Sequence, residues 1–272
     1  MEGITREQLQ KLEVLRDYLR ELHSVAVAFS GGVDSAFLLK TAADVLGNRA
    51  IAMTIRSCVF PQREFEEAAA FCEGQGIRQL VCETDQLGIA GFAENPKNRC
   101  YLCKKEMFAK MLKMAGEHQM KHLVEGSNMD DDGDYRPGLQ AVAELGIKSP
   151  LRECNLTKAD IRALSKCLKL PTWEKPSYAC LASRFAYGET ITREKLDMVD
   201  RAEQLLLELG FRQMRVRIHG TMARIEIEPG QFAKLMQDWV RDEIVNKFRA
   251  YGFSYVSLDL MGYRTGSMNE VL

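Results

Sequence analysis

Long apolar runs are absent from the sequence, which excludes a membrane-spanning helix. Such a helix needs about 20 consecutive apolar residues, and no stretch of the 272 residues comes near that length. The segment Met1–Leu22 alternates charged side chains with leucine, a pattern that a signal peptide does not have. We therefore expect a cytoplasmic protein without a membrane partner.

The sequence also lacks an excess of charge of either sign. Its 37 lysine and arginine residues balance 38 aspartate and glutamate residues, for a formal net charge of -1. A protein that wraps nucleic acid usually needs a basic face, so we expect no nucleic-acid partner, while a local basic pocket is compatible with the composition. Hydrophobic residues make up 46% and charged residues 28% of the chain, as in a folded globular protein.

Cysteine is too sparse for a disulfide-stabilised scaffold. The chain has 8 cysteines in 272 residues, below the density of small secreted disulfide proteins. In the reducing cytosol, clustered cysteines more often bind a metal or take part in catalysis. The number of cysteines does not distinguish these roles, so each cysteine is assigned from its position in the sequence.

Short apolar runs alternate with helical segments over the first part of the chain. The expected strands are Val25–Phe29, Ala50–Ile55, Leu80–Cys82, Leu123–Val124 and Ile147–Leu151. The expected helices are residues 5–22, Ser35–Leu46, Glu64–Glu73, Lys104–Glu117 and Leu139–Leu145, and one that opens at the capping residue Thr157. This alternation predicts an α/β fold with a doubly wound parallel sheet, in which ligands bind beyond the carboxyl ends of the strands.

The alternation breaks after Pro171, and a smaller α+β domain is expected there. An irregular stretch, Trp173–Gly188, is followed by elements that we predict from apolar periodicity. They are a helix over Glu194–Leu209, a hairpin of Met214–Ile218 and Ala223–Ile227, a helix over Gln231–Trp239 and a strand over Ser254–Leu258. We place the domain boundary between residues 184 and 185.

A loop that suits anion binding lies where the first expected strand meets the next helix. Its sequence is Ser30-Gly31-Gly32-Val33-Asp34-Ser35. Paired glycines let backbone amides approach an anion closely, and the helix N-terminus adds a positive dipole. The loop lacks the lysine and the spacing of a Walker motif. A simple glycine turn is the alternative, but the position after the first strand favours anion binding.

Two cysteines form a CxxC pair, Cys100 and Cys103, where a loop enters a helix. This position places both sulfurs on one side of the helix, and the helix dipole favours thiolates. Zinc, an iron–sulfur cluster and a redox disulfide are all open for a lone CxxC. Cys180 is a third candidate, because positive charge on Lys175 and Arg184 would favour its thiolate.

The other five cysteines are interpreted as structural. Cys72, Cys82 and Cys167 fall on apolar patterns of helices or strands, where cysteine packs as a small hydrophobic residue. Cys58 and Cys154 lie in loops and stay undecided, with packing favoured.

The segment Ser30–Ser35 resembles the PP-loop of ATP pyrophosphatases, which split ATP into AMP and pyrophosphate while they adenylate a substrate. The resemblance implies that the loop holds the pyrophosphate end of ATP and that Asp34 helps to hold Mg²⁺. It places the nucleotide against Ala28, Ser30, Gly31, Gly32, Asp34, Ser35, Thr54, Ile55, Arg56, Gly126, Ser127 and Asn128. For Ser127 and Asn128, an ordinary turn is the alternative.

Longer segments resemble one group of PP-loop enzymes, the LarE family of ATP-dependent sulfur transferases. The segments are Gly126-Ser127-Asn128 with Asp130-Asp131, Asp134-Tyr135-Arg136-Pro137-Gly138, Ser149-Pro150-Leu151-Arg152, Trp173-Glu174-Lys175-Pro176, Cys180-Leu181-Ala182-Ser183-Arg184 and Gly262-Tyr263-Arg264-Thr265-Gly266. The resemblance runs over about residues 10–270. It implies a PP-loop domain, of the adenine nucleotide alpha hydrolase-like fold, over residues 1–184, and a substrate or oligomerisation domain over residues 185–272.

The resemblance also implies a substrate and a pathway. The family adenylates a carboxylate of pyridinium-3,5-biscarboxylic acid mononucleotide and converts it to a thiocarboxylate, for the nickel-pincer nucleotide cofactor of lactate racemase. A substrate with one phosphate and two carboxylates needs cations, and guanidinium groups match both. The candidates are Arg184, Arg215, Arg217 and Arg264. Arg215 and Arg217 alternate along one strand and share a face, for which a solvated sheet face is the alternative.

The family uses two sources of sulfur, and the cysteines of this chain favour one. In one type, a cysteine at the position of Cys180 gives up its own sulfur and becomes dehydroalanine. In the other type, three cysteines hold a [4Fe–4S] cluster. Because Cys100 and Cys103 accompany Cys180, we predict the cluster type, which would require an external sulfide source. The family resemblance also suggests a homo-oligomer.

Three other functions are compatible with parts of the sequence. An ammonia-using synthetase of the NAD or GMP type would leave the three cysteines without a role. A tRNA thiolase is disfavoured by the neutral net charge. A nucleotide-binding sensor without turnover would bind ATP but release no pyrophosphate.

Overall fold

The protein is described from a computed structural model that covers residues 4–131, 137–176, 179–264 and 266–267. The chain forms two compact units. The first comprises Met1–Thr84 and Asn98–Tyr178, and the second comprises Asp85–Lys97 and Ala179–Leu272. A short internal segment thus belongs to the same unit as the C-terminal part of the chain.

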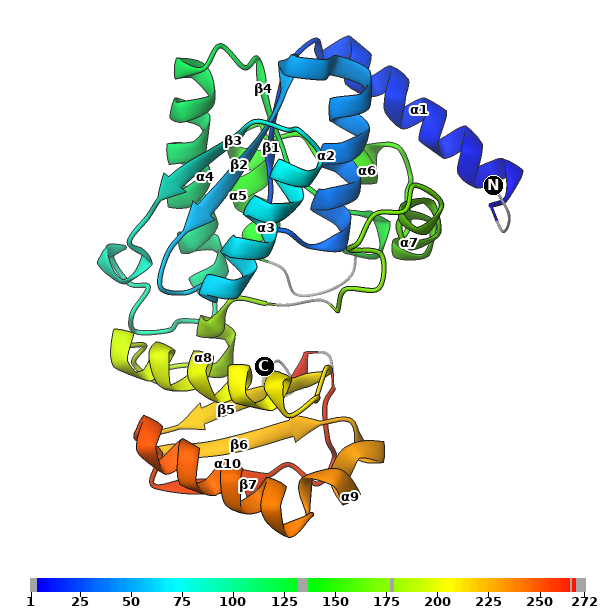
Figure 1. Cartoon of the computed structure of the whole chain (residues 1–272). Coiled ribbons are helices and arrows are strands. Elements are labelled where there is room, and N and C mark those ends of the chain that lie inside the picture. The colour runs from blue at the N-terminus through cyan, green and yellow to red at the C-terminus, as the bar shows by residue number, and fades with distance from the viewer. Residues whose placement is uncertain (1–3, 132–136, 177–178, 265, 268–272) are drawn as a thin grey trace. The chain divides into compact units, whose positions relative to one another are not determined.

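The first unit is built on a parallel sheet of four strands (Figure 1). The strands are β1 (Val25–Ala28), β2 (Ala50–Arg56), β3 (Gln79–Glu83) and β4 (His122–Val124), in the order β3-β2-β1-β4. Every pair of neighbours is parallel. Residues Val25–Val27 and Ala50–Thr54 are buried without alternation, as expected for strands covered on both faces. The prediction of an α/β fold with a parallel sheet is confirmed.

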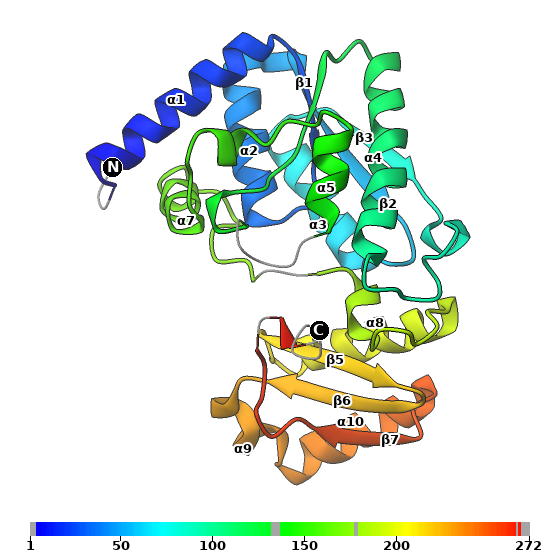
Figure 2. The same ribbon diagram turned by 180° about the vertical axis from the view of Figure 1, so that it is seen from behind.

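Helices cover both faces of this sheet (Figures 1 and 2). They are α1 (Arg6–Leu22), α2 (Val33–Leu46), α3 (Gln62–Gly74), α4 (Arg99–Glu117), α5 (Gly138–Glu144), α6 (Pro150–Glu153) and α7 (Lys158–Cys167). Leu15, Phe37 and Ile161 belong to one apolar cluster, which contains α1, α2 and α7. Phe108 and Val142 belong to the cluster on the other face, with α4 and α5.

One predicted element of the first unit is wrong. The apolar run Ile147–Leu151 was expected to form a fifth strand, but only Lys148 forms a parallel bridge, with Val124. Pro150 follows at the first position of α6. Proline has no backbone N–H for a sheet ladder, whereas its fixed φ suits the start of a helix. The run therefore leaves the sheet after a single bridge.

Asp160 links the start of α7 to α1 through a buried network. Its carboxylate accepts hydrogen bonds from Lys11 Nζ at 2.8 Å and from Gln8 Nε2 at 3.2 Å. It also accepts one from the backbone N–H of Thr157, whose side chain caps α7 as predicted. Burial raises the pKa of Asp160, but the hydrogen bonds from Lys11 and Thr157 outweigh it and hold the pKa at about 2.

Asp160→Asn is expected to lower the free energy of unfolding by about 1–2 kcal/mol at neutral pH. A carboxyl whose pKa is depressed by folding stabilises the protein fully above its unfolded pKa, and this contribution is lost as the pH falls towards 2. The difference between variant and wild type should therefore shrink between about pH 4 and pH 2. Urea denaturation at several pH values measures it, with exposed Asp17→Asn as the control. A difference that is independent of pH would contradict the assignment.

The second unit contains a three-stranded sheet in the order β5-β6-β7. β5 (Met214–His219) and β6 (Met222–Ile227) form the predicted antiparallel hairpin, and β7 (Tyr255–Leu258) pairs with β6 in parallel. The helices of this unit are α8 (Arg193–Glu208), α9 (Phe232–Leu235) and α10 (Asp238–Tyr251). Within the described ranges, no helix of the chain is both long enough and apolar enough to cross a membrane.

The prediction of one helix over Gln231–Trp239 is wrong. α9 has four residues, and Gln237 is extended before α10 begins. The apolar positions of α10 are Val240, Ile244 and Phe248, which are spaced at i, i+4 and i+8. Charged residues, among them Arg241, Asp242, Glu243 and Lys247, lie between these positions, so the apolar stripe is narrow and the periodicity is weak.

Candidate active site

The phosphate loop runs from the end of β1 into the first turn of α2. Ser30 Oγ lies 3.1 Å from Ser35 Oγ, and Ser35 Oγ donates to the Gly32 carbonyl at 3.2 Å. Gly32 is the N-cap of α2 and makes no side-chain capping bond. The loop thus has a fixed shape and ends at a helix N-terminus, which is the arrangement that binds phosphate.

Close packing favours glycine at two positions of the site. Gly31 has φ +73°, and a Cβ there would lie 3.3 Å from the Cβ of Ala68 on α3. A Cβ on Gly126 would lie 3.1 Å from the backbone N of Ser35. The structure therefore brings the segment after β4 against the first turn of α2. The contact of both segments with a nucleotide is still a prediction.

Asp34 directs one carboxylate oxygen at Lys158, and its other oxygen has no partner in the described ranges. Oδ2 pairs with the ammonium of Lys158 at the start of α7. Oδ1 is buried and has no hydrogen-bond partner among the residues that the structure describes. Burial raises the pKa of Asp34, and the positive charge of Lys158 opposes this effect. A buried carboxylate oxygen without a donor fits a ligand of a divalent cation.

Ser127 and Asn128 hold the turn that follows β4. Glu125 is buried and accepts hydrogen bonds from the Ser127 N–H at 3.1 Å and from Ser127 Oγ at 2.8 Å. The N–H of Asn128 donates to Asp131 Oδ2 at 3.0 Å, and Asn128 Oδ1 accepts from the Asp130 N–H at 2.9 Å. These contacts shape the backbone beside the phosphate loop.

The residues predicted to follow the second strand are its last three residues. Thr54 is buried, and its Oγ1 accepts a hydrogen bond from Gln79 Nε2 at 2.8 Å. Ile55 packs against the apolar cluster around α4. Arg56 lies over the Phe65 ring, 5.3 Å from its centroid. Ala28 likewise ends β1 and is partly buried.

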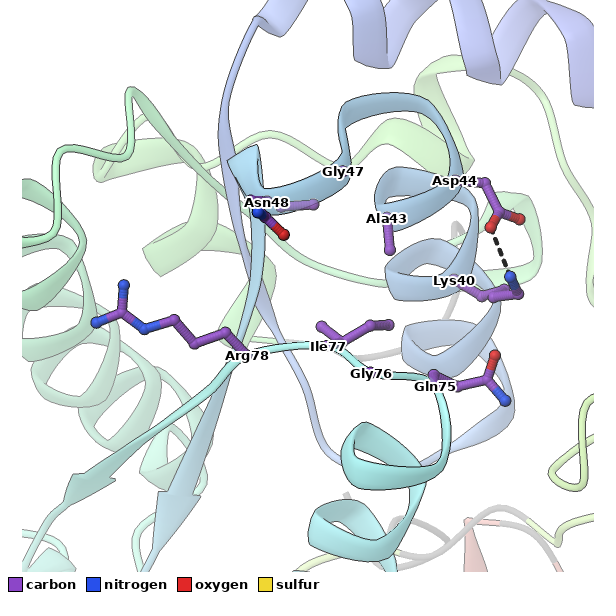
Figure 3. A pocket seen from close by; sticks show the side chains of 10 residues that line it. Lys40, Ala43, Asp44, Gly47, Asn48, Gln75, Gly76, Ile77 and Arg78 are labelled. Atoms are coloured by element: carbon purple, nitrogen blue, oxygen red, sulfur yellow. Dashed lines mark hydrogen bonds and ion pairs between the residues drawn. The ribbon is translucent and has the colours of Figure 1, made fainter.

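A cavity of about 480 Å³ lies at the opposite end of the strands (Figure 3). It is lined by Lys40, Asp44, Asn48, Gln75 and Arg78, among others. Ala50, at the start of β2, also lines it, so the cavity is at the amino ends of the strands. None of the predicted site residues contributes to this cavity, and ligands of such sheets bind at the carboxyl ends.

Cys100 and Cys103 lie on the first turns of α4, which begins at Arg99 and not at Lys104 as predicted. Cys100 is exposed and Cys103 is half-buried. Their spacing of three residues places them on one side of the helix. Cys180 is half-buried and belongs to the other unit. Over the described part of the chain, no three His, Cys, Asp or Glu side chains are grouped as a metal site.

Three of the remaining cysteines are buried and suit packing. Burial raises the pKa of the Cys72 thiol to about 12 and that of Cys154 to about 11. Burial also raises the pKa of Cys82. A protonated thiol is a poor nucleophile, so these three thiols suit the core. Cys58 and Cys167 are half-buried.

Arg184 holds the backbone around Cys180. It is 1% exposed and forms a two-pronged ion pair with Glu203 on α8, with both N–O distances at 2.8 Å. Its third nitrogen donates to the carbonyl oxygens of Ala179 at 2.8 Å and Cys180 at 3.2 Å. The guanidinium of Arg184 is therefore buried and engaged by protein groups that fix this backbone. The predicted contact of Arg184 with substrate is still a prediction.

Arg215 and Arg217 lie on the same face of β5, as predicted. Their register partners on β6 are Glu226 and Arg224. Arg217 donates to Glu226 Oε2 and to Ser267 Oγ, both at 2.9 Å, and its Nε is buried without a partner in the described part of the chain. Arg215 lies over the Tyr263 ring, and burial together with the charge of Arg184 lowers its pKa. A buried guanidinium with an unused donor suits an anionic ligand.

Arg264 lies in the C-terminal segment and faces Asp259. Its Nη1 lies 3.6 Å from Asp259 Oδ1, and its side chain is 26% exposed. Asp259 is also 3.7 Å from Arg224 Nε. Asp134, Tyr135, Arg136 and Thr265, which carry part of the family resemblance, lie outside the described residues.

Lys158 was not identified from the sequence as a residue of the site. Lys175 was placed beside Cys180, which is not the partner that the structure shows. Lys158 is the first residue of α7 and contacts Asp34; the absence of a Walker lysine from the loop could have prompted a search for another cation. Lys175 was expected to act on Cys180, but its ammonium is paired with Glu64 at 2.8 Å and Glu67 at 2.6 Å. These partners lie on α3, far away in sequence.

Comparison with known proteins agrees with this architecture. Residues 8–120 match the NAD synthase family. A protein of Synechocystis sp., described as uncharacterized protein slr1717, is 44% identical over 96% of this chain and 98% of its own length. A glutamine-hydrolyzing GMP synthase chain of Thermoplasma volcanium is 26% identical over 64% of this chain and 60% of its own.

A relative with a described product decides the family. Pyridinium-3,5-bisthiocarboxylic acid mononucleotide synthase of Lactiplantibacillus plantarum is 36% identical over 93% of this chain and 92% of its own length. An alignment over 93% of this chain extends over both units. It confirms the resemblance drawn from the motifs: the chain belongs to the LarE family of PP-loop enzymes, the ATP-dependent sulfurtransferases.

Proposed function

We propose that this enzyme uses ATP to convert pyridinium-3,5-biscarboxylic acid mononucleotide to its thiocarboxylate, a step towards the nickel-pincer nucleotide cofactor of lactate racemase. The observation that carries the proposal is the similarity over 93% of the chain to a synthase of the bisthiocarboxylic acid product. The phosphate loop at the start of α2 supports the ATP-dependent half of the reaction.

The first step is adenylation of a substrate carboxylate. A carboxylate oxygen attacks the α-phosphorus of ATP, the bond to the pyrophosphate oxygen breaks, and an acyl-adenylate forms. The amides at the start of α2 and the ammonium of Lys158 would stabilise the departing pyrophosphate. Asp34 Oδ1, buried without a partner in the described chain, would hold Mg²⁺, which neutralises charge on the phosphates.

The second unit would hold the anionic substrate. Arg215 and Arg217 share one face of β5, and Arg264 lies 3.6 Å from Asp259, which is also 3.7 Å from Arg224 on β6. Among the described residues of this arginine cluster, Arg217 and Arg224 pair with Glu226. We assign binding of the substrate phosphate to this cluster, and the division into an adenylating unit and a substrate unit follows.

The sulfur step needs a nucleophile that displaces AMP from the acyl-adenylate. We propose that Cys100, Cys103 and Cys180 hold a [4Fe–4S] cluster. Two observations support this proposal: Cys100 and Cys103 share one side of the start of α4, and none of the three thiols is buried. When bound, the cluster supplies hydrosulfide as the nucleophile. The protein's own part is to present the thiolates and to keep the Cys180 backbone fixed through Arg184.

The second candidate mechanism uses Cys180 alone. Its Sγ attacks the acyl carbon and AMP leaves; removal of the Cα proton then breaks the Cβ–Sγ bond, so the thiocarboxylate departs and dehydroalanine remains. The half-exposed position of Cys180 favours this route, because a nucleophile must reach its substrate. The presence of Cys100 and Cys103 favours the cluster.

An anaerobic assay with ATP, Mg²⁺, sulfide and the pyridinium dicarboxylate mononucleotide tests the function. We expect pyrophosphate and a thiocarboxylate product, in equal amounts, measured by a coupled assay and mass spectrometry. The matches to NAD synthase and to a GMP synthase chain keep an ammonia-using synthetase as the alternative. An amide product with ammonium would establish that alternative, and binding of ATP without pyrophosphate release would indicate a sensor.

Partners beyond the substrate are part of the same proposal. We propose that the protein acts in the cytoplasm as a homo-oligomer and receives sulfide from an external source. The cluster mechanism requires that source, because each turnover consumes one sulfur atom.

A further inference from the structure

Lys175 contacts the backbone of the phosphate loop and has no role in the proposed function. Its Nζ donates to the Gly31 carbonyl oxygen at 3.2 Å. The same nitrogen contacts Glu64 at 2.8 Å and Glu67 at 2.6 Å on α3. Three elements therefore meet at one ammonium: the loop, α3 and the segment that contains Lys175.

The ammonium is held in place by its surroundings. The side chain of Lys175 is 12% exposed and that of Glu64 is 14% exposed. Burial lowers the pKa of Lys175, but the hydrogen bond and charge of Glu64, with those of Glu67, outweigh it, so the pKa is raised. The group thus stays charged, and a charged donor in partly desolvated surroundings makes a strong hydrogen bond.

The backbone of Lys175 is fixed from another direction. Arg162 on α7 donates to the carbonyl oxygen of Trp173 at 2.6 Å and to that of Lys175 at 3.0 Å. The N–H of Lys175 donates to the Thr172 carbonyl at 2.9 Å. Lys175 therefore acts on the loop from an anchored position.

The contact with Gly31 determines where the loop points its amides. The Gly31 carbonyl and the Gly32 N–H belong to one planar trans peptide, so they point in opposite directions. Fixing the carbonyl towards Lys175 aims the Gly32 N–H away from it and towards Ser30 Oγ, to which this N–H donates a long hydrogen bond of 3.4 Å. Gly31, with φ +73°, has the freedom to turn this peptide over if the carbonyl is released.

We propose that Lys175 is a positioning residue that presets the Gly32 amide for the pyrophosphate part of ATP. The lysine itself does not touch the nucleotide. Its loss should weaken ligands that carry a β-phosphate and spare those that end at the α-phosphate. The inference rests on the ATP-binding part of the proposed function and is independent of the sulfur source.

Titration calorimetry of the full chain with ATP, pyrophosphate and AMP, each with Mg²⁺, tests this assignment. For Lys175→Met we expect the affinities for ATP and pyrophosphate to fall about tenfold, equivalent to about 1.4 kcal/mol, and that for AMP to change less than twofold. Lys247→Met on α10, where the lysine is 51% exposed, is the matched control and should change none of them.

The possible results distinguish a failure of the positioning role of Lys175 from a failure of the proposed function. If Lys175→Met does not fold, Lys175→Gln takes its place, because its shorter side chain cannot reach the Gly31 carbonyl; the same pattern is expected. Equal losses for ATP and AMP, or no loss for either, overturn the positioning role. If the wild-type protein binds no ATP, the proposed function itself fails.

Discussion

Cys180→Ala should lower the rate of thiocarboxylate formation by roughly 10³-fold or more, while ATP-dependent pyrophosphate release continues. Adenylation needs the phosphate loop and the substrate carboxylate, and the sulfur is required only afterwards. Cys180 is half-buried and supplies the thiol in both candidate mechanisms. Pyrophosphate and thiocarboxylate are measured in the same reaction, so that the two steps are separated.

Cys100→Ala and Cys103→Ala distinguish the two mechanisms. Under the cluster mechanism, each should abolish sulfur transfer and lower the iron and acid-labile sulfide of anaerobically prepared protein. Under the sacrificial mechanism, each should leave the first turnover within about threefold of wild type, and Cys180 should lose the elements of H₂S in the mass spectrum. Cys167→Ala is the control, because this half-buried thiol ends α7 and carries no proposed role. Colourless wild-type protein without iron or sulfide would overturn the cluster.

Arg184→Met should lower the free energy of unfolding by about 3 kcal/mol. The variant leaves Glu203 buried, with an exposure of 0%, and without its two-pronged partner. The charge of Arg215, which also lowers the pKa of Glu203, compensates in part, so we expect the low end of the range for a broken buried pair. Urea denaturation measures the loss.

The double variant Arg184→Met/Glu203→Leu tests whether the loss of stability in Arg184→Met comes from the unpaired charge of Glu203. Because both charges are then removed, it should be more stable than Arg184→Met alone, although the N–H of Val216, which donates to Glu203 at 3.0 Å, loses its acceptor. Arg193→Met, whose side chain is 66% exposed, should change stability by less than about 0.5 kcal/mol. An Arg184→Met variant as stable as Arg193→Met would show that the buried pair contributes little.

Apolar patterns predicted most strands and helices of the first unit. They failed where the same apolar run can form either a strand or a helix. Continuous apolar runs such as Val25–Val27 are buried on both faces of a parallel sheet, so they are read directly from the sequence. The run Ile147–Leu151 has the same composition, yet Pro150 turns it into α6. The missed helix α10 has a narrow apolar stripe among charges, which weakens any local signal.

Local motifs predicted the chemistry because their groups are close in sequence. The phosphate loop is six consecutive residues between a strand and a helix, and the CxxC pair spans one turn of α4. Backbone conformation and helix position alone place these groups. The family, and with it the ATP-dependent sulfurtransferase activity, was therefore accessible from the sequence, and the relatives confirm both.

The sequence by itself determined the sheet class, the phosphate loop and the family. Only the tertiary structure decided what the long cationic side chains do. Arg184 pairs with a carboxylate 19 residues away, and Lys175 with one 111 residues away. A flexible charged side chain can pair with any group that the fold brings within its reach. Its role as a ligand, a clamp or a positioning group therefore depends on which partner the folded chain places beside it.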